Sequence, residues 1–206
     1  MHPYVKGETA MQRSDEQTLA EMVELARSGD SLAFDALFSS YNASICTFLA
    51  RMVGNEEEGR DLAQETFLKV WRTLPSIRDT TRFRSWLYRI ATNVALDYQR
   101  ARYWQRFFKR GLLSRPLDSS VHQRGLEERL VEAELVQEAL AQLSPTNRSC
   151  LLLKIDAGFS LQEIATMLHI SAKNVSVSLC RGREQFYRAY CKLATEQEAP
   201  SERRSL

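Results

Sequence analysis

Apolar residues recur at intervals of three and four along most of this chain, and that spacing constrains its fold more than any other feature. Such spacing places apolar side chains on one face of an α-helix. The longest run lies between Asp30, which can cap a helix, and Gly54, which can end one. Its apolar members are Phe34, Leu37, Phe38, Tyr41, Ile45, Phe48, Leu49 and Met52. We therefore expect an all-α fold, with this segment as the core helix of a first domain.

One internal stretch breaks the pattern and divides the chain. Residues Phe107 to Gly125 contain glycine, proline and serine without a sustained period, as a flexible linker does. We expect two small helical domains that move somewhat independently, the second carrying a helix-turn-helix. The expected divisions are a disordered N-terminus (1–14), a helical domain (15–105), a linker (106–125), a second helical domain (126–194) and a disordered tail (195–206).

Charge is distributed unevenly, although the formal net charge is only +2. Residues 78–110 hold nine Lys or Arg against two Asp, a local balance of +7. Residues 56–65 reverse the sign, with five carboxylates against one arginine. A polyanion would match the first segment, and a basic protein surface would match the second.

Several classes of function are disfavoured by what the sequence lacks. The four cysteines lie far apart without a CxxC pair, and no histidine flanks them at ligand spacing, so we expect no metal and no other cofactor. No nucleophile has general acids or bases around it, and no glycine-rich loop could cradle a phosphate, so we expect no enzymatic activity. No apolar run reaches the roughly 18–20 residues of a membrane span, and no signal-peptide core is present. We expect a soluble, cytoplasmic protein with no membrane insertion of its own.

The acidic segment from Glu57 to Leu74 is predicted to be a helix that Pro75 ends. At 100° per residue, its core side holds Ala63, Phe67, Val70 and Leu74. The opposite side holds Asp61, Gln64, Glu65, Leu68 and Arg72. Periodicity alone leaves two interpretations of that side: a solvated polar face, or a docking face for a protein partner.

A further helix is predicted from about Arg82 to Tyr103. Its outer face is expected to mix basic, aromatic and amide groups, which suits unpaired nucleic acid because bases stack on rings and phosphates meet arginine. The residues expected on this face or at its edge are Arg84, Tyr88, Arg89, Thr92, Asn93, Leu96, Gln99 and Arg100.

The segment from Phe159 to Glu184 has the pattern of a helix-turn-helix. Ser160 and Glu163 form a capping box, and His169 stands where such motifs often need a positive φ. The second helix should bury Val175 and Leu179 and present the opposite side to a DNA major groove. The outward residues are Lys173, Asn174, Ser176, Val177, Cys180 and Arg181. Of these, Arg181 suits guanine or phosphate, Asn174 suits adenine or backbone, and a packing hairpin is the alternative.

Four segments in this order resemble the extracytoplasmic-function (ECF) sigma factors of the sigma-70 family of bacterial RNA polymerase. The resemblance runs from about Leu19 to Tyr190. It is carried by AFDALFSSY, DLAQETFLKVW, FRSWLYRIATNVALDY and the series from LSPTNRSCLLLK to GFSLQEIATMLHIS. It implies that the first domain is sigma region 2, that the second is sigma region 4, and that the chain initiates transcription at specific promoters.

The resemblance also implies roles for individual residues. Asp61, Gln64, Glu65 and Leu68 would contact core RNA polymerase. Contacts with the melted minus-10 element, where a base is flipped into a pocket, would come from Arg78, Arg82, Trp86, Arg89, Asn93 and Arg100. The outward residues of the helix-turn-helix would read the minus-35 element as duplex. Trp86 remains equally compatible with a place in the core, and an anti-sigma factor is a further implied partner.

Two other functions remain open at this point. A conventional helix-turn-helix activator or repressor would be a dimer that binds intact duplex by itself. A DNA-processing enzyme would need the reactive groups that the sequence lacks. Ser176 and Ser178 stand where the family often has a basic residue, so the promoter sequence is not predicted.

Overall fold

The computed structural model describes residues 17–109 and 127–198, and within these ranges all regular structure is helical, as predicted. A helix over 17–27 comes first. It is followed by α2 (Ser31–Val53), α3 (Glu56–Thr73), the short 3-10 helices η1 (Leu74–Ser76) and η2 (Thr80–Arg82), α4 (Phe83–Lys109), α5 (Glu127–Ala141), α6 (Pro145–Ile155), α7 (Leu161–Leu168) and α8 (Ala172–Glu198). The expected disordered N-terminus and most of the expected linker lie outside the described residues, whereas α8 continues to Glu198, beyond the predicted start of the tail.

Helix ends lie where the capping residues predicted them. The side chain of Asp30 accepts hydrogen bonds from the amides of Leu32 and Ala33 at 2.9 and 3.1 Å. Gly54 ends α2 with φ 86°, in the left-handed region that favours glycine. These two residues fix the length of the central helix of the first domain.

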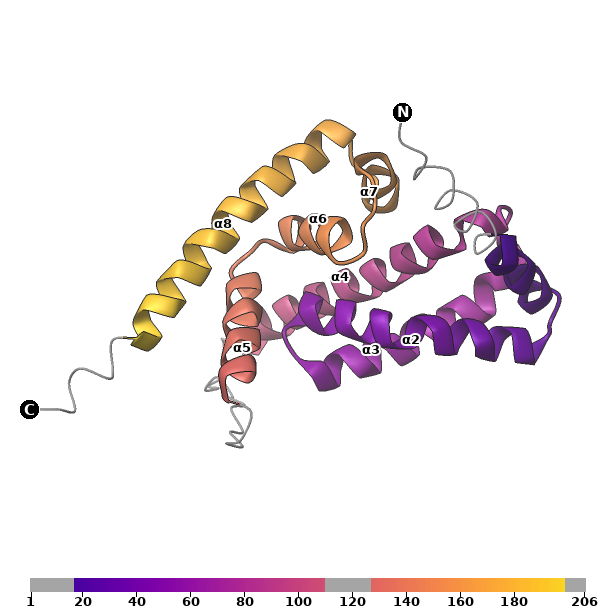
Figure 1. Ribbon diagram of the computed structural model, residues 1–206, viewed down its shortest axis with the longest axis horizontal. Helices are drawn as coiled ribbons and strands as arrows, with labels where there is room; N and C mark the ends of the chain where they lie inside the picture. The colour runs from indigo at the N-terminus through magenta and orange to yellow at the C-terminus, as the bar shows by residue number, and fades with distance from the viewer. Residues whose placement is uncertain (1–16, 110–126, 199–206) are drawn as a thin grey trace, which may run out of the picture.

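The first domain is built on the antiparallel pair α2 and α3, with α4 packed along both (Figure 1). Its centre holds Ile45, Phe48, Leu49 and Met52 from α2, none more than 2% exposed. The predicted core side of α3 is confirmed, since Ala63, Phe67 and Val70 are all buried. The opposite side of α3 therefore faces outward.

Gly59 permits the close approach of α2 and α3. A Cβ atom at this position would lie 2.6 Å from the Cα and the backbone nitrogen of Ala50. Real side chains do not make such contacts, so the two helices pack closely only because residue 59 has no side chain. The groups that would clash are backbone atoms, which cannot turn aside.

Replacing Gly59 by alanine should therefore destabilise the first domain, despite the better helix propensity of alanine. The expected loss in free energy of unfolding is about 1–3 kcal/mol, the usual result of overpacking. Urea unfolding followed by circular dichroism measures it. Glu57→Ala, at an exposed position two residues earlier in α3, is the control for a change to alanine without steric crowding. A stability of Gly59→Ala equal to or above that of the parent would contradict the close contact.

The second domain packs α5, α6 and α7 against the long helix α8. Ser144 caps α6 by accepting from the amide of Asn147, and Pro145 occupies the first turn, where its missing N–H is harmless. Cys150, Leu153, Ile164 and Val175 are completely buried and form its centre. This small core holds α7 and the start of α8 in a fixed relation.

The two domains lie in contact, with α6 and α7 against α4 and with α5 and α6 against α2 (Figure 1). Tyr88, expected on the outer face of α4, is only 5% exposed. Its ring packs between Phe48 at 5.3 Å and Phe159 of the second domain at 5.2 Å. Thr92 is also completely buried. The prediction that both face outward was wrong. For Tyr88 the reason is the contact with Phe159, because a helical wheel drawn for one domain does not include a second domain on that side.

Candidate partner and nucleic-acid interfaces

The outer side of α3 is exposed as predicted. Asp61, Gln64, Glu65 and Leu68 are all accessible, and Leu68 is 57% exposed. The carboxylate of Glu65 pairs with the ammonium group of Lys69 at 2.7 Å, one turn away. Among the described residues, the principal contacts of α3 are with α2, α4 and η1, and none is with a helix of the second domain. It is an acidic surface with one apolar side chain in its middle, free to meet another protein.

Trp71 extends this surface and was missed by the sequence analysis. It is 45% exposed, and its ring meets the Phe34 ring edge-on with centroids 4.6 Å apart. It lies three residues beyond Leu68, so the two side chains are neighbours on the helix. The spacing of three residues from Leu68 could have predicted that Trp71 lies on the same exposed side of the helix. Trp71 was overlooked because a tryptophan in an amphipathic helix usually belongs to the core.

A cleft of about 680 Å³ opens between the turn after α3, the first turns of α4, and α7. It brings together four of the residues predicted to contact the minus-10 element, namely Arg78, Arg82, Trp86 and Arg89. Asn93 and Arg100 are exposed farther along α4 and do not line this cleft. The predicted set therefore divides into a cleft group and two outlying residues, of which Arg100 pairs with Asp97 at 2.9 Å.

The turn that carries the cleft arginines is held by Asp79. Its carboxylate accepts from the amide of Thr81 at 3.2 Å and pairs with the Arg82 guanidinium at 3.0 Å. The hydrogen bond from the Thr81 hydroxyl lowers the pKa of the Asp79 carboxyl. The Asp79 carboxylate thus links the Thr81 amide to the Arg82 guanidinium and holds the turn beside the cleft.

Trp86 combines the two roles that the sequence left open. The residue is half-buried, and its ring lies 6.0 Å from that of Phe83, a core residue. It also lines the cleft beside Arg82 and Arg89. An aromatic ring held in this way offers a fixed stacking surface to a base.

The helix-turn-helix has the predicted local geometry. The amide of Glu163 donates to the Ser160 hydroxyl at 3.3 Å, and the amide of Ser160 donates to the Glu163 carboxylate at 2.8 Å, which completes the capping box. His169 occupies the turn with φ 54° and ψ 41°, in the left-handed region. Ser171 then caps α8 by accepting from the amide of Asn174 at 3.1 Å.

The six residues predicted to face DNA from α8 are all exposed: Lys173, Asn174, Ser176, Val177, Cys180 and Arg181. Val175 and Leu179 are buried beneath them, as predicted. The hydroxyl of Ser176 donates to the Ala172 carbonyl at 3.1 Å, within its own helix. Because the hydroxyl proton is used in this bond, Ser176 can only accept a further hydrogen bond, so it suits donor groups of the DNA bases.

Comparison with known proteins identifies the two helical domains with two known regions. Residues 37–105 match the family model "Sigma-70 region 2", and residues 133–186 match "Sigma-70, region 4". The chain is 31% identical over 187 residues to the RNA polymerase sigma-H factor of Pseudomonas aeruginosa, covering 85% of this chain and 95% of that protein. It is 30% identical over 177 residues to the ECF RNA polymerase sigma factor SigW of Bacillus subtilis, covering 82% and 95%. The chain belongs to the ECF subfamily of the sigma-70 family.

Solved structures agree with the fold of this sigma factor. The complex of CnrH with the cytosolic domain of CnrY aligns with a TM-score of 0.62 at 22% identity, covering 82% of this chain and 95% of that chain. The sigma factor RpoE from Bartonella quintana, solved with the anti-sigma factor NepR, aligns with a TM-score of 0.62 at 20% identity, covering 76% and 95%. The first domain is thus region 2, the second is region 4, and this sigma factor acts in transcription initiation.

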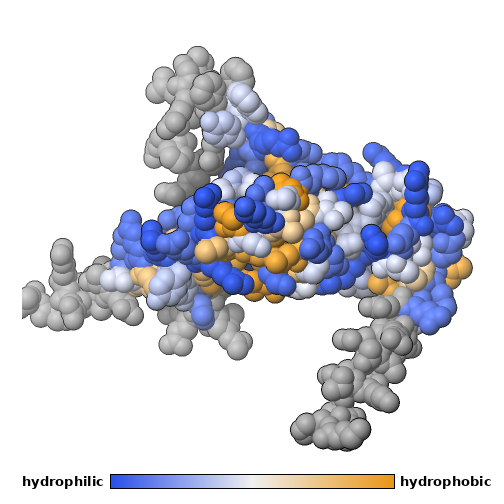
Figure 2. Space-filling view, turned by 90° about the horizontal axis from the view of Figure 1, so that it is seen from above, coloured by the Kyte–Doolittle hydropathy of each residue, from blue (hydrophilic) through white to orange (hydrophobic). Residues whose placement is uncertain are grey.

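Hydrophilic side chains cover most of the face of this sigma factor that is seen from above, with smaller hydrophobic patches between them (Figure 2). No helix in residues 17–109 and 127–198 is long and apolar enough to cross a membrane. Over the same residues, no group of three or more His, Cys, Asp or Glu is placed to hold a metal ion. Leu68, Trp71 and Val177 are apolar side chains that are exposed on the candidate surfaces.

The thiols of this sigma factor differ sharply in environment, and alkylation should separate them. Cys180 is exposed, whereas Cys150 is buried, and burial raises the pKa of its thiol to about 11. We expect iodoacetamide at pH 8 to modify Cys180 in the native chain and to spare Cys150 until the chain unfolds, as peptide mass mapping would measure. Equal modification of the two in the native state would contradict the buried position. Because Cys180 lies on the side of α8 predicted to face DNA, unchanged duplex affinity after alkylation would also exclude a role of this thiol in DNA reading.

Proposed function

We propose that this sigma factor binds core RNA polymerase through α3, receives the melted minus-10 element in the cleft at the start of α4, and reads the minus-35 element with α8. The observation that carries the proposal is the presence of three distinct exposed surfaces in one chain, each in the region where the family resemblance places it. One surface is acidic, and the other two are basic or polar.

The α3 surface suits a basic protein partner. Asp61 and Glu65 lie one turn apart on the same side of the helix, and Leu68 and Trp71 add apolar contact area. Acidic charge of this kind guides encounter and fixes orientation, and apolar side chains supply much of the affinity. The combination resembles a docking surface more than a solvated face, where large apolar side chains are uncommon.

The cleft suits an extruded base with its phosphates. Arg78, Arg82 and Arg89 supply positive charge around the ring of Trp86. Extruding a base costs a few kcal/mol, which stacking and edge contacts offset without nucleotide hydrolysis. In this proposal Asn93 and Arg100 bind the strand after it leaves the cleft, because both lie farther along α4 and are exposed.

The start of α8 suits the major groove. Lys173, Asn174 and Arg181 are exposed on the helix that follows the turn, and a groove admits one helix.

An anti-sigma factor is a further proposed partner. It is supported by the solved relative from Bartonella quintana, which was crystallised with one.

Transcription in vitro tests the proposal against a conventional helix-turn-helix regulator. The full chain is mixed with purified bacterial core polymerase and a library of promoter fragments, and transcripts are sequenced. We expect transcripts with shared sequences near positions −35 and −10 only when the chain is present. A dimer that binds duplex without polymerase, together with no chain-dependent transcript, would favour the regulator and exclude the proposal.

A further inference from the structure

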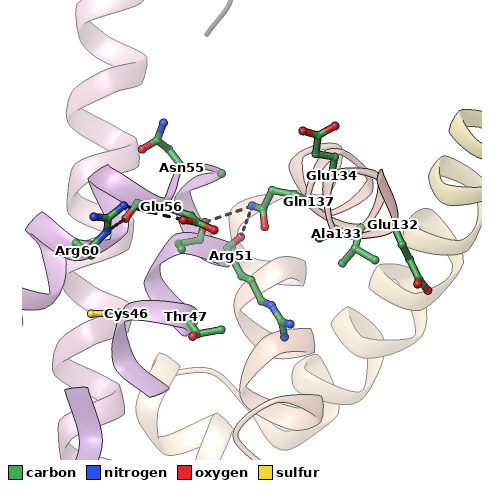
Figure 3. A pocket seen from close by; sticks show the side chains of 13 residues that line it. Cys46, Thr47, Arg51, Asn55, Glu56, Arg60, Glu132, Ala133, Glu134 and Gln137 are labelled. Atoms are coloured by element: carbon green, nitrogen blue, oxygen red, sulfur yellow. Dashed lines mark hydrogen bonds and ion pairs between the residues drawn. The ribbon is translucent and has the colours of Figure 1, made fainter. Parts of the chain in front are cut away.

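The cysteines of this sigma factor occupy three kinds of environment. Cys150 is completely buried in the core of region 4. Cys46 is half-buried on the wall of a cleft of about 860 Å³ between α2, α3 and α5 (Figure 3). Burial raises the pKa of the Cys46 thiol, so little of it is present as the reactive thiolate. Cys180 and Cys191 are exposed, and both belong to α8.

The two exposed thiols lie on one side of α8, which runs along the outer edge of the molecule (Figure 1). Cys191 follows Cys180 by eleven residues, or about three helical turns with an offset of roughly 20°. Tyr187 lies between them on the same side and is 69% exposed. Its hydroxyl forms a hydrogen bond with Cys191, which raises the pKa of Tyr187. The opposite side of the helix is buried at Val175 and Ala189.

These two thiols cannot form a disulfide within one chain. At a rise of about 1.5 Å per residue, the Cα atoms of Cys180 and Cys191 stand roughly 16 Å apart. A disulfide needs Cα atoms within about 7 Å of each other. Because α8 is one continuous helix over Ala172–Glu198, the two residues cannot approach. A bond between Cys180 and Cys191 must therefore join two copies of the chain.

Charge favours one way for two α8 helices to meet along this side. In an antiparallel pair, a twofold axis midway between Glu184 and Tyr187 places Cys180 of each copy opposite Cys191 of the other. Glu184 then faces Tyr187 of the other copy and lies beside its Arg188, a residue that already pairs with Glu184 at 2.6 Å within one chain. A parallel pair would place Glu184 against Glu184, and like charges disfavour it. The antiparallel pair thus has complementary charges at its centre and one pair of facing thiols at each end.

This pair of helices should be weak until the thiols are oxidised. The stretch from Cys180 to Cys191 covers only about three turns, which is far less surface than a stable interface buries. The exposed Arg181 and Arg183 add positive charge beside it in both copies. We therefore expect the reduced chain to be a monomer, and covalent bonds to be needed to hold two copies together.

We propose that peroxide joins two copies of this sigma factor through two symmetric Cys180–Cys191 disulfides, and that the resulting dimer cannot read the minus-35 element. In each bond, one thiolate attacks a peroxide oxygen and becomes a sulfenic acid, releasing hydroxide. The facing thiolate of the other copy attacks that sulfur, forms the S–S bond and releases a second hydroxide. With the two thiol protons, both hydroxides become water. Two sulfur atoms are oxidised, and one peroxide is reduced.

Loss of promoter reading follows from the place of Cys180, and this half of the proposal rests on the function proposed above. Val177 and Cys180 lie on the side of α8 predicted to face DNA, next to Arg181. A major groove admits one helix, so a second α8 on this side excludes the duplex. Reduction by thiol–disulfide exchange separates the copies and exposes the reading surface again.

Oxidation of the purified full chain tests the pairing. After treatment with hydrogen peroxide, non-reducing electrophoresis and peptide mass mapping should show a dimer whose linked peptides join Cys180 to Cys191. Cys180→Ser and Cys191→Ser should each form about tenfold less dimer alone, because the remaining thiol then faces a serine. An equal mixture of the two variants should form dimer again, through one bond per pair. Cys46→Ser is the control and should dimerise like the parent.

Random collision of exposed thiols would give a different pattern. Each single variant would then dimerise on its own through its remaining exposed thiol, and Cys180–Cys180 and Cys191–Cys191 peptides would appear. That pattern would overturn the proposal, as would a parent chain that stays monomeric under peroxide or a mixture that forms no more dimer than its components. Circular dichroism checks that both serine variants keep the helix content of the parent.

Transcription with core polymerase tests the consequence. The covalent dimer is first separated from peroxide and monomer on a sizing column. We expect it to direct about tenfold less transcription than the reduced parent, with recovery after dithiothreitol, because the competent fraction is small. Cys191→Ser treated with peroxide should transcribe like its untreated form. Full transcription by the purified dimer would overturn the loss of promoter reading. If the reduced parent directs no transcription while the serine variants pair as expected, the proposed function fails and the disulfide pairing stands.

Discussion

Replacing Asp61 and Glu65 together by lysine should abolish binding to core RNA polymerase. The two carboxylates lie on the exposed side of α3, and reversal also places a lysine beside Lys69, which now pairs with Glu65. Losing one partner of a well-packed charge pair costs 2–5 kcal/mol or more, so two reversals should weaken binding by more than about 100-fold. Co-elution of chain and polymerase on a sizing column, followed by fluorescence titration, measures the effect.

The control for this experiment is a double reversal elsewhere in the first domain. Glu21→Lys with Asp35→Lys makes the same change in net charge at exposed positions outside α3. We expect it to bind polymerase within a factor of about three of the parent, with the small change arising from long-range charge. Both double variants should keep the helical circular dichroism of the parent. Equal loss of affinity in the two would show that overall charge, not the α3 surface, directs docking.

Replacing Arg181 by alanine should weaken recognition of the minus-35 element by about 1–3 kcal/mol, or roughly 10- to 100-fold. Arg181 is exposed on the predicted groove-facing side of α8, with Leu179 buried beneath it. Fluorescence anisotropy of the polymerase complex with a labelled upstream promoter duplex measures the affinity. Arg183 is the matched control, because it is also exposed but points to the opposite side of the helix, 200° around.

The pattern of loss distinguishes the two contacts proposed for Arg181. If the guanidinium binds a guanine, Arg181→Ala loses discrimination at one base pair and leaves other positions unchanged. If it binds a phosphate, affinity falls equally for all sequences and the salt dependence decreases by about one charge. A parent-like affinity for every sequence would remove Arg181 from the interface.

Local structure was well predicted because its causes are local. Asp30 and Gly54 define α2, and Ser160 with Glu163 defines the start of α7, through hydrogen bonds that span four residues or fewer. His169 in the turn was likewise expected from its place in the pattern, and its φ of 54° confirms it. Caps, turns and helical faces are properties of short segments.

Contacts between the domains were not predictable from periodicity. Arg84, Arg148 and Phe159 meet region 2 or region 4 across more than 70 residues of sequence, and nothing in the spacing of either helix identifies the partner. The burial of Tyr88 against Phe159 was mispredicted for the same reason. A helical wheel assumes one packed side, whereas α4 is packed by its own domain on one side and by a second domain on another.

The candidate sites were predicted less completely than the helix caps but better than the contacts between the domains. Exposure of the α3 and α8 surfaces follows from the wheel, and the structure confirms it. The grouping of Arg78, Arg82, Trp86 and Arg89 in one cleft depends on the turn between α3 and α4. This turn contains two 3-10 helices, whose geometry helical periodicity does not predict. The family resemblance supplied the remaining step from exposed residues to assigned roles.

The C-terminal end of α2 is completed by another domain. The last carbonyl groups of a helix have no donors within it and carry the negative end of its dipole. Here the amide of Gly54 donates to the Ala50 carbonyl at 2.8 Å. The Gln137 side chain donates to the Arg51 carbonyl, and the Arg148 side chain donates to the Met52 carbonyl. Water can replace these donors one for one. If the two domains separated, the infrared bands of isotope-labelled carbonyls at Arg51 and Met52 should shift. The hydration of these two peptide groups would then report whether the domains are in contact.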